Sequence, residues 1–225
     1  MALARFYGIL PMPPGDPFRL FVWEVMTVHS TPRKRDAALG ANTLTIAAGH
    51  TVDAMRFVVG DFGQLSAVVA TQAKQWLDTG TNTMLDVTSP DNVLISGRLA
   101  NGAVASVHIG AIPFAGSGYR MEIYGRNGTL VATGEDSPQL SEVSLHGAKG
   151  NDTLAPVPVP ERFILAAPGT PSGEAINVGQ MYTLFARAIR DGETHQPTFE
   201  TAIDLHRLVD AIKSASDNGR EAAFE

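Results

Sequence analysis

The centre of the chain is built from short runs of alternating apolar and polar residues, and turn signals separate these runs. Asn101-Gly102 is the strongest of these signals, because both residues tolerate the positive φ angles that a tight hairpin turn demands. A second hairpin is expected where residues 119–124 meet residues 129–132 across the glycine-bounded turn 125–128. We therefore expect antiparallel strand pairs at the centre of the fold.

Further strands and loops surround these hairpins. The strand pattern covers residues 18–28, 64–77, 86–88, 92–99 and 103–112. Between residues 135 and 173 the composition shifts to Gly, Pro, Ser and Asp, with one short alternating stretch at residues 157–159. This composition predicts surface loops and edge strands.

Three helices are expected around the strands. Residues 44–59 are apolar on most sides, which predicts a helix buried between a sheet and another layer. Gly60 ends this helix in the usual carboxyl-cap position. Apolar residues at helical spacing predict a second helix over residues 176–189, and Thr198 begins a third.

The order of these elements indicates the fold class. One buried helix, a run of mostly antiparallel strands and a closing pair of helices describe an α+β fold, a single domain over residues 1–225. We expect a large open sheet with its helices packed on one face. The other face is expected to be apolar, which predicts a homodimer or a larger homo-oligomer formed through the sheet.

Composition excludes several classes of function. The chain has 225 residues, 17 basic and 23 acidic side chains and a net charge of -6, and neither sign forms a long run, so we expect no nucleic-acid partner. The absence of cysteine excludes disulfides, thiolate metal sites and cysteine nucleophiles. Because no apolar run approaches the roughly 20 residues of a membrane-spanning helix, we expect a soluble protein without a membrane segment. The absence of cysteine permits the cytoplasm, which is the compartment that we expect.

Motifs for nucleotides and metals are missing from the sequence. Neither G-x-G-x-x-G nor G-x-x-x-x-G-K-[ST] occurs, so the chain has no visible cradle for nucleotide phosphates. The six histidines lie far apart, and none belongs to an H-E-x-x-H pair. We therefore expect no metal site and no nucleotide-binding domain within this chain.

His50 and Asp53 are the best candidates for chemistry. They lie one helical turn apart in an apolar run, so they share a face of the expected helix and can act on one ligand. A neutral imidazole suits proton transfer near pH 7. The alternative interpretations are a core histidine bonded to a backbone carbonyl, and an Asp53 that pairs with Arg56 or caps a loop.

Three segments resemble the carboxyl-terminal domain of the glucose-fructose oxidoreductase, inositol dehydrogenase and rhizopine-catabolism (Gfo/Idh/MocA) family. The first is residues 42–62, with the central Gly49-His50 and the later Asp53. The second is residues 119–130, which resemble paired strands around a G-x-x-G turn, and the third is residues 185–219, which resemble the closing helices. Their order and spacing match the family over nearly the whole chain.

The resemblance implies that two domains with different functions form the complete protein. In that family an amino-terminal Rossmann domain binds NAD or NADP and carries the catalytic lysine, so neither the cofactor site nor that lysine maps onto this chain. A Rossmann domain in cis or in trans would supply them. The family helix carries D-x-x-x-H, in which the histidine acts on the substrate hydroxyl. His50 matches the histidine, whereas Ile46 stands in the place of the carboxylate.

Two hypotheses follow from the resemblance. In the first, the chain is the substrate-binding and oligomerisation domain of a sugar or polyol dehydrogenase and is inactive alone. His50 would then be the general acid/base, and Asp53 or Asn42 would position the small-molecule substrate. In the second, the chain is a non-catalytic binding or regulatory module similar to the galactose-regulon repressor, in which the segment before the histidine is often apolar.

Overall fold

The computed structural model describes residues 36–78, 80–111 and 116–224, which form two compact units. The first unit comprises the chain up to residue 113 together with residues 205–225, and the second comprises residues 114–204. Both contain antiparallel sheets and helices, which confirms the α+β prediction. The predicted strand at residues 18–28 lies outside the described residues, and the prediction of one domain over residues 1–225 stays a prediction.

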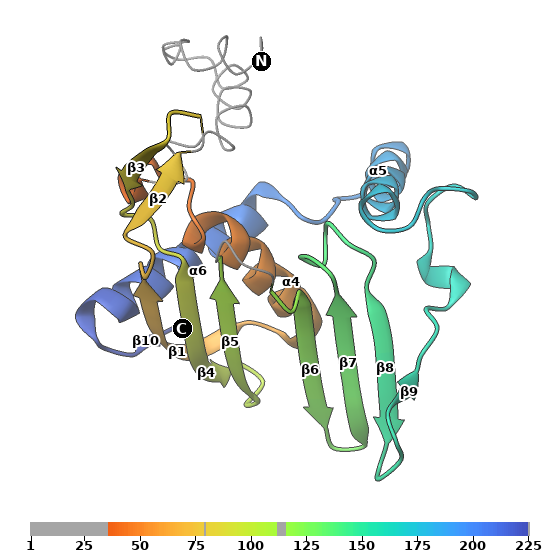
Figure 1. Ribbon diagram of the computed structural model, residues 1–225. Helices are drawn as coiled ribbons and strands as arrows, with labels where there is room; N and C mark the ends of the chain where they lie inside the picture. The colour runs from red at the N-terminus through yellow and green to blue at the C-terminus, as the bar shows by residue number, and fades with distance from the viewer. Residues whose placement is uncertain (1–35, 79, 112–115, 225) are drawn as a thin grey trace. The chain divides into compact units, whose positions relative to one another are not determined.

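The described residues of the first unit form ten elements (Figure 1). They are η1 (Ala37–Leu39), the π-helical turn η2 (Leu44–Ala48), α4 (Gly49–Val59), β1 (Phe62–Ala70), β2 (Gln75–Asp78), β3 (Thr83–Asp86), β4 (Asn92–Leu99), β5 (Val104–Gly110), most of α6 (Phe199–Asn218) and β10 (Ala222–Ala223). Four of the strands form an antiparallel sheet in the order β10-β1-β4-β5. The predicted helix at residues 44–59 is confirmed, with Gly60 as its carboxyl cap.

One face of this sheet is buried beneath helices. Leu65 of β1 and Val93 of β4 are fully buried, as are Val52 of α4 and Ile212 of α6. The backbone N–H of Val69 in β1 donates to the hydroxyl of Ser216 in α6, 2.8 Å away. Side chains alternate between the two faces of a strand, so the neighbours of the buried residues lie on the open face.

The Asn101-Gly102 hairpin joins β4 to β5 as predicted, but its turn differs from the expected one. Gly102 is the residue of this turn with positive φ, at 89°, and its N–H donates to the carbonyl of Leu99. The side-chain amide of Asn101 donates to the carbonyl of Val59, and its oxygen accepts from Ala103. The turn therefore also ties the end of α4 to the sheet.

The predicted strand at residues 64–77 is divided by a bend. The carboxylate of the buried Asp91 accepts hydrogen bonds from the backbone N–H groups of Gln72 and Ala73 at 2.7–3.0 Å. These bonds turn the chain out of the sheet after β1. Strands β2 and β3 then pair with each other as a separate two-stranded ribbon.

Six elements lie wholly within the described residues of the second unit. They are β6 (Tyr119–Gly125), β7 (Gly128–Gly134), β8 (Ser144–Lys149), β9 (Ala155–Pro156), η3 (Glu161–Phe163) and α5 (Glu174–Asp191). The strands form an antiparallel sheet in the order β6-β7-β8-β9, and the predicted hairpin across residues 125–128 is confirmed. Strand β8 is an interior strand, although the sequence analysis expected only loops and edge strands there.

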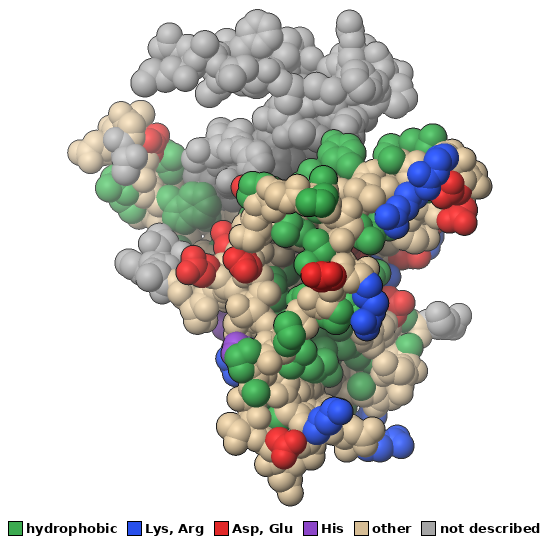
Figure 2. Space-filling model, turned by 90° about the vertical axis from the view of Figure 1, so that its right-hand side faces the viewer, with side chains coloured by type: hydrophobic (Ala, Val, Ile, Leu, Met, Phe, Trp, Pro, Cys, Tyr) green, Lys and Arg blue, Asp and Glu red, His purple; other side chains and the backbone are tan. Residues whose placement is uncertain are grey.

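The apolar side chains of the second unit are mostly half-buried. Alternate residues of β6, among them Met121 and Ile123, share one face with Leu130 of β7. Val131 and Ala188 are the buried hydrophobic residues among those described in this unit. Hydrophobic side chains also lie among polar ones across the surface shown in Figure 2. In the part of the chain that the structure describes, no helix is both long and apolar enough to span a membrane.

Candidate functional site

Asn42 begins the helical segment that carries the candidate residues. Its side-chain oxygen accepts hydrogen bonds from the backbone N–H groups of Leu44 at 3.0 Å and Thr45 at 3.3 Å. Asparagine is a favoured helix cap because its oxygen satisfies such unpaired donors. Asn42 is nearly buried and has a structural role here. Its predicted contact with substrate stays a prediction.

A π-helical turn, η2, separates this cap from His50. The N–H of Ala48 donates to the carbonyl of Thr43, five residues earlier, at 2.8 Å. Such turns are rare, are less regular than α-helix and occur frequently at functional sites. The helix predicted over residues 44–59 therefore begins with a π-helical segment and continues as α4.

His50 lies on the open side of α4. Its side chain is exposed, that of Asp53 is half-buried, and no hydrogen bond of either side chain is found among the described residues. The interpretation of His50 as a core histidine is therefore wrong. The expected pairing of Asp53 with Arg56 is also wrong, because the guanidinium of Arg56 pairs with Asp61 at the end of the helix.

Phe57 shares the open side of α4 with His50. Seven residues separate them, nearly two turns, so they lie on the same face of the helix. The side chain of Phe57 is 91% exposed. The sequence predicts that the whole helix over residues 44–59 is buried, so the exposure of Phe57 corrects that prediction. Phe57 lies about 140° around the helix from the buried Val52, and the sequence does not distinguish the two sides because both carry apolar residues.

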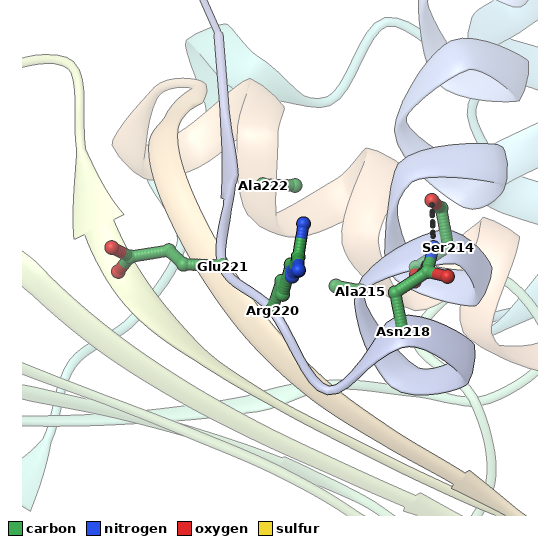
Figure 3. A pocket seen from close by; sticks show the side chains of 6 residues that line it. All are labelled: Ser214, Ala215, Asn218, Arg220, Glu221 and Ala222. Carbon is green, nitrogen blue, oxygen red and sulfur yellow. Dashed lines mark hydrogen bonds between the residues drawn. The ribbon is translucent and has the colours of Figure 1, made fainter.

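A shallow depression of about 550 Å³ lies elsewhere in the first unit. It is lined by the end of α6 and the start of β10, namely Ser214, Ala215, Asn218, Arg220, Glu221 and Ala222 (Figure 3). The Asn218 amide donates to Ser214, and Gln64 donates to Glu221. None of the three predicted site residues lines this depression. Among the described residues, no group of three or more acidic or histidine side chains could hold a metal ion.

The chain matches a known protein-family model. A family model described as the carboxyl-terminal domain of Gal80p matches residues 20–134. An uncharacterized oxidoreductase of Synechocystis sp. is 33% identical over 118 residues. This match covers 52% of the chain and 29% of that protein.

Two solved structures share the fold. The super-repressor mutant of Gal80p from Saccharomyces cerevisiae matches 88% of this chain and 54% of its own, with a TM-score of 0.73 and 18% identity. Levoglucosan dehydrogenase in complex with NADH and L-sorbose matches 90% of this chain and 56% of its own, with a TM-score of 0.73 and 21% identity. The chain therefore spans about half the length of these two proteins.

Proposed function

This chain belongs to the Gal80p-like carboxyl-terminal domains of the Gfo/Idh/MocA oxidoreductase family, and from that premise we propose that it is the substrate-binding half of an oxidoreductase. The reaction would oxidise a CH–OH group of a sugar or polyol with NAD or NADP. Levoglucosan dehydrogenase, whose structure holds NADH and L-sorbose, supports this class of substrate and cofactor.

The exposed imidazole of His50 is the observation that carries the proposal. No hydrogen bond within the described residues occupies its nitrogens, and Asp53 lies one turn further along α4. Oxidation of an alcohol to a carbonyl requires that the hydroxyl lose a proton, and a neutral imidazole can accept it near pH 7. Asp53 would hold a second hydroxyl of the substrate by hydrogen bonding.

The nicotinamide cofactor does not fit the residues of this chain. The sequence has no glycine-rich phosphate cradle, and α4 carries the carboxylate of Asp53 one turn after His50. A cofactor of this kind carries negative phosphates, which the carboxylate of Asp53 would repel. A nucleotide-binding domain, in cis or in trans, would therefore hold it.

The test is the replacement of His50 in a protein that contains both halves. His50→Ala should lower the rate of NAD(P)H formation by about 10²-fold or more, as the loss of a general base does. His206→Ala is the matched control, because His206 is an exposed helical histidine of α6, outside the proposed site. The panel of substrates includes levoglucosan and L-sorbose. Equal rates for the two variants would remove His50 from the reaction.

A regulatory module similar to Gal80p is the second candidate. It is favoured by Ile46, which places a hydrocarbon one turn before His50, where the family helix has a carboxylate. At that position no carboxylate is present to orient the imidazole by a hydrogen bond. If the two-domain protein binds a sugar but forms no NAD(P)H with any substrate of the panel, the regulatory function holds and the enzymatic one fails.

The open face of the first sheet is our proposed surface for homo-oligomerisation. Ser66, Ser96 and Ser106 form a row of small hydroxyls across β1, β4 and β5. Val68 at 56% exposure and Val104 at 77% flank this row on the same face. A flat face that combines apolar and small polar side chains suits contact with a second copy.

Sedimentation measures this association. The unmodified chain should sediment as a dimer or larger, and Leu94→Glu on the same face should shift it to a monomer. Leu154→Glu, at an exposed leucine of the second unit, is the control. A monomeric unmodified chain would contradict the proposal.

A further inference from the structure

We propose that His108 of β5 is a pH switch for the association of two copies of this chain. The open face of the first sheet pairs with a second copy while the His108 imidazole is neutral, and the pair separates when the imidazole becomes charged. This inference rests on the oligomer surface of the proposed function and adds the group that regulates it. His108 lies opposite Leu94 of β4, which lies opposite Val68 of β1, so the three side chains form one row across the open face.

A chain of two hydrogen bonds holds the His108 ring. The side-chain nitrogen of Asn92 donates to Oδ1 of the buried Asp91 at 2.9 Å, and Oδ1 of Asn92 lies 3.3 Å from Nε2 of His108. A carboxylate only accepts hydrogen bonds, so the amide nitrogen must face Asp91 and the amide oxygen must face His108. The amide oxygen also only accepts. In the neutral ring, Nε2 therefore carries the hydrogen and Nδ1 carries the lone pair.

Nδ1 is consequently the atom that takes up a proton. No hydrogen bond to Nδ1 is found among the described residues, and His108 is exposed on the open face. Imidazole is the side chain whose charge ordinarily changes between about pH 5 and pH 8. In that range the ring gains both a positive charge and an N–H that has no acceptor in the described part of the chain.

The open face has no carboxylate to balance that charge. Arg98 of β4 is the one other charged side chain among the residues of β1, β4 and β5, and its guanidinium donates to the carbonyl of Gly102. The carboxylate of Asp91 is buried behind Asn92, where it accepts from backbone N–H groups. A charged His108 therefore adds a second cation to a face that already carries one.

A second copy is the occupant that this charge pattern fits. While His108 is neutral, the face presents Val68 at 56% exposure, Leu94 at 42% exposure and the small serines of the neighbouring row, with Arg98 as its single charge. A strongly charged partner would find few opposite charges there, whereas an identical face brings apolar side chains against apolar side chains. The same symmetry makes the charge of His108 appear twice in the contact. Burial of an unpaired cation is costly, so association is full where the imidazole is neutral and is lost as the pH falls.

Sedimentation equilibrium of the full natural protein tests the switch. The Kd of the dimer should rise at least about tenfold between about pH 8 and about pH 5.5 at constant ionic strength. Far-ultraviolet circular dichroism checks that the fold is intact at both values. Burial raises the pKa of Asp91, but hydrogen bonds to its carboxylate outweigh burial and hold the pKa below the ordinary aspartate value. Asp91 therefore stays ionised at both values and does not contribute to the change.

Three variants assign the response to His108. His108→Gln cannot become charged and keeps a side-chain N–H donor, so its dimer should have the same Kd at both pH values. His108→Lys carries a permanent charge and should be monomeric at both. His206→Gln, at an exposed histidine of α6, is the control and should respond to pH as the unmodified protein does.

The outcomes separate this inference from the proposed oligomer surface. A dimer whose Kd does not change with pH, or a pH response that persists in His108→Gln, overturns the switch and leaves the surface. A dimer of the unmodified protein that forms equally well with His108→Lys also overturns the switch. A monomer at every pH overturns both the surface and the switch.

Discussion

The two four-stranded sheets differ in how well their apolar faces are covered. In the first unit, Leu65, Val93 and Ile95 of the sheet are buried together with side chains of α4 and α6. In the second unit, Val131 is the buried hydrophobic residue among the described strands, and α5 contributes only Ala188. Both sheets are antiparallel and have four strands. Strand pairing alone therefore does not produce a hydrophobic core. The helices that cover a sheet determine how much its side chains contribute to the free energy of unfolding.

The difference shows where substitutions should be costly. Burial of apolar area stabilises a fold in proportion to the area removed from water. A side chain in the covered face of the first sheet should thus contribute several times more to the free energy of unfolding than its counterpart in the second sheet. Polar groups should follow the same rule, because a hydrogen bond contributes most where its partners would otherwise be buried and unsatisfied.

Truncation of Leu65 should have the largest effect. Leu65→Ala removes a fully buried side chain from β1 and should lower the free energy of unfolding by about 2–5 kcal/mol. Leu130→Ala, at a half-exposed leucine of β7, is the matched control and should cost about 1 kcal/mol or less. Urea unfolding, with hydrogen exchange as a separate readout for each unit, measures both. Equal losses would show that the second sheet is covered as well as the first.

Removal of the Asp91 carboxylate should have the next largest effect. Asp91→Ala leaves the N–H groups of Gln72 and Ala73 without their acceptor and should cost about 1.5–3 kcal/mol. Asp136→Ala is the control, because Asp136 accepts a backbone hydrogen bond in an exposed turn of the second unit. Its replacement should leave the unfolding midpoint unchanged.

The effect of Asp91 should depend on pH. Burial raises the pKa of its carboxyl group, but hydrogen bonds from Ala73, Gln72 and Asn92 outweigh burial and hold the pKa below the ordinary value for aspartate. A group whose pKa is lowered by folding contributes its stability above the unfolded value, about 3.9. The difference between wild type and Asp91→Ala should therefore be full at neutral pH and shrink as the pH falls below about 4. A difference that stays constant down to pH 2 would contradict this account.

Substitution of one glycine in each sheet shows how well that sheet tolerates an added methyl group. A Cβ at Gly97 of β4 would lie 2.1 Å from the carbonyl oxygen of Gln64, which is backbone and cannot move aside. Gly97→Ala should cost about 1–3 kcal/mol. A Cβ at Gly147 of β8 would instead meet a methyl group of Val157 at 2.9 Å, on an exposed side chain that can rotate away. Gly147→Ala should therefore cost less in the same urea titration, and the reverse order would show that the edge of the second sheet is rigid.

Elements whose structure depends only on residues close in sequence could be predicted from the sequence. The helix that ends at Gly60 and the hairpin at Gly102 were predicted correctly, because helical periodicity and the need for a positive φ are local properties. The bend after β1 was missed because it depends on Asp91, which follows Gln72 by 19 residues. Strand β8 was missed because its Gly147 and its loop-like surroundings conceal the pairing with β7.

The helical position of His50 and Asp53 was predicted correctly, but their surroundings were not. His50 and Asp53 do share a helix face, as their spacing requires. Their exposure could not be predicted, because both sides of α4 carry apolar residues. Val52 and Phe57 have similar hydrophobicity, yet the first is fully buried and the second is 91% exposed. Which side meets the sheet is decided by packing in the core of the first unit, where Leu65 and Ile212, both distant in sequence, are fully buried as well.

Substitution of Glu122 in β6 should have the smallest effect on stability. Glu122 is an exposed carboxylate, in contrast to the buried Asp91. Its carboxylate accepts from the hydroxyl of Tyr124 at 2.8 Å and pairs with Arg120, all on an exposed strand surface. Glu122→Gln should leave the unfolding midpoint unchanged, because exposed ion pairs contribute little. The hydrogen bond to Glu122 and the charge of its carboxylate raise the pKa of Tyr124. Glu122→Gln should therefore shift the ultraviolet titration of Tyr124 to lower pH. The signal of Tyr124 is assigned as the one that disappears in the Tyr124→Phe variant. A changed midpoint would mean that this face is covered, and an unchanged titration would mean that the Tyr124–Glu122 hydrogen bond does not persist in solution.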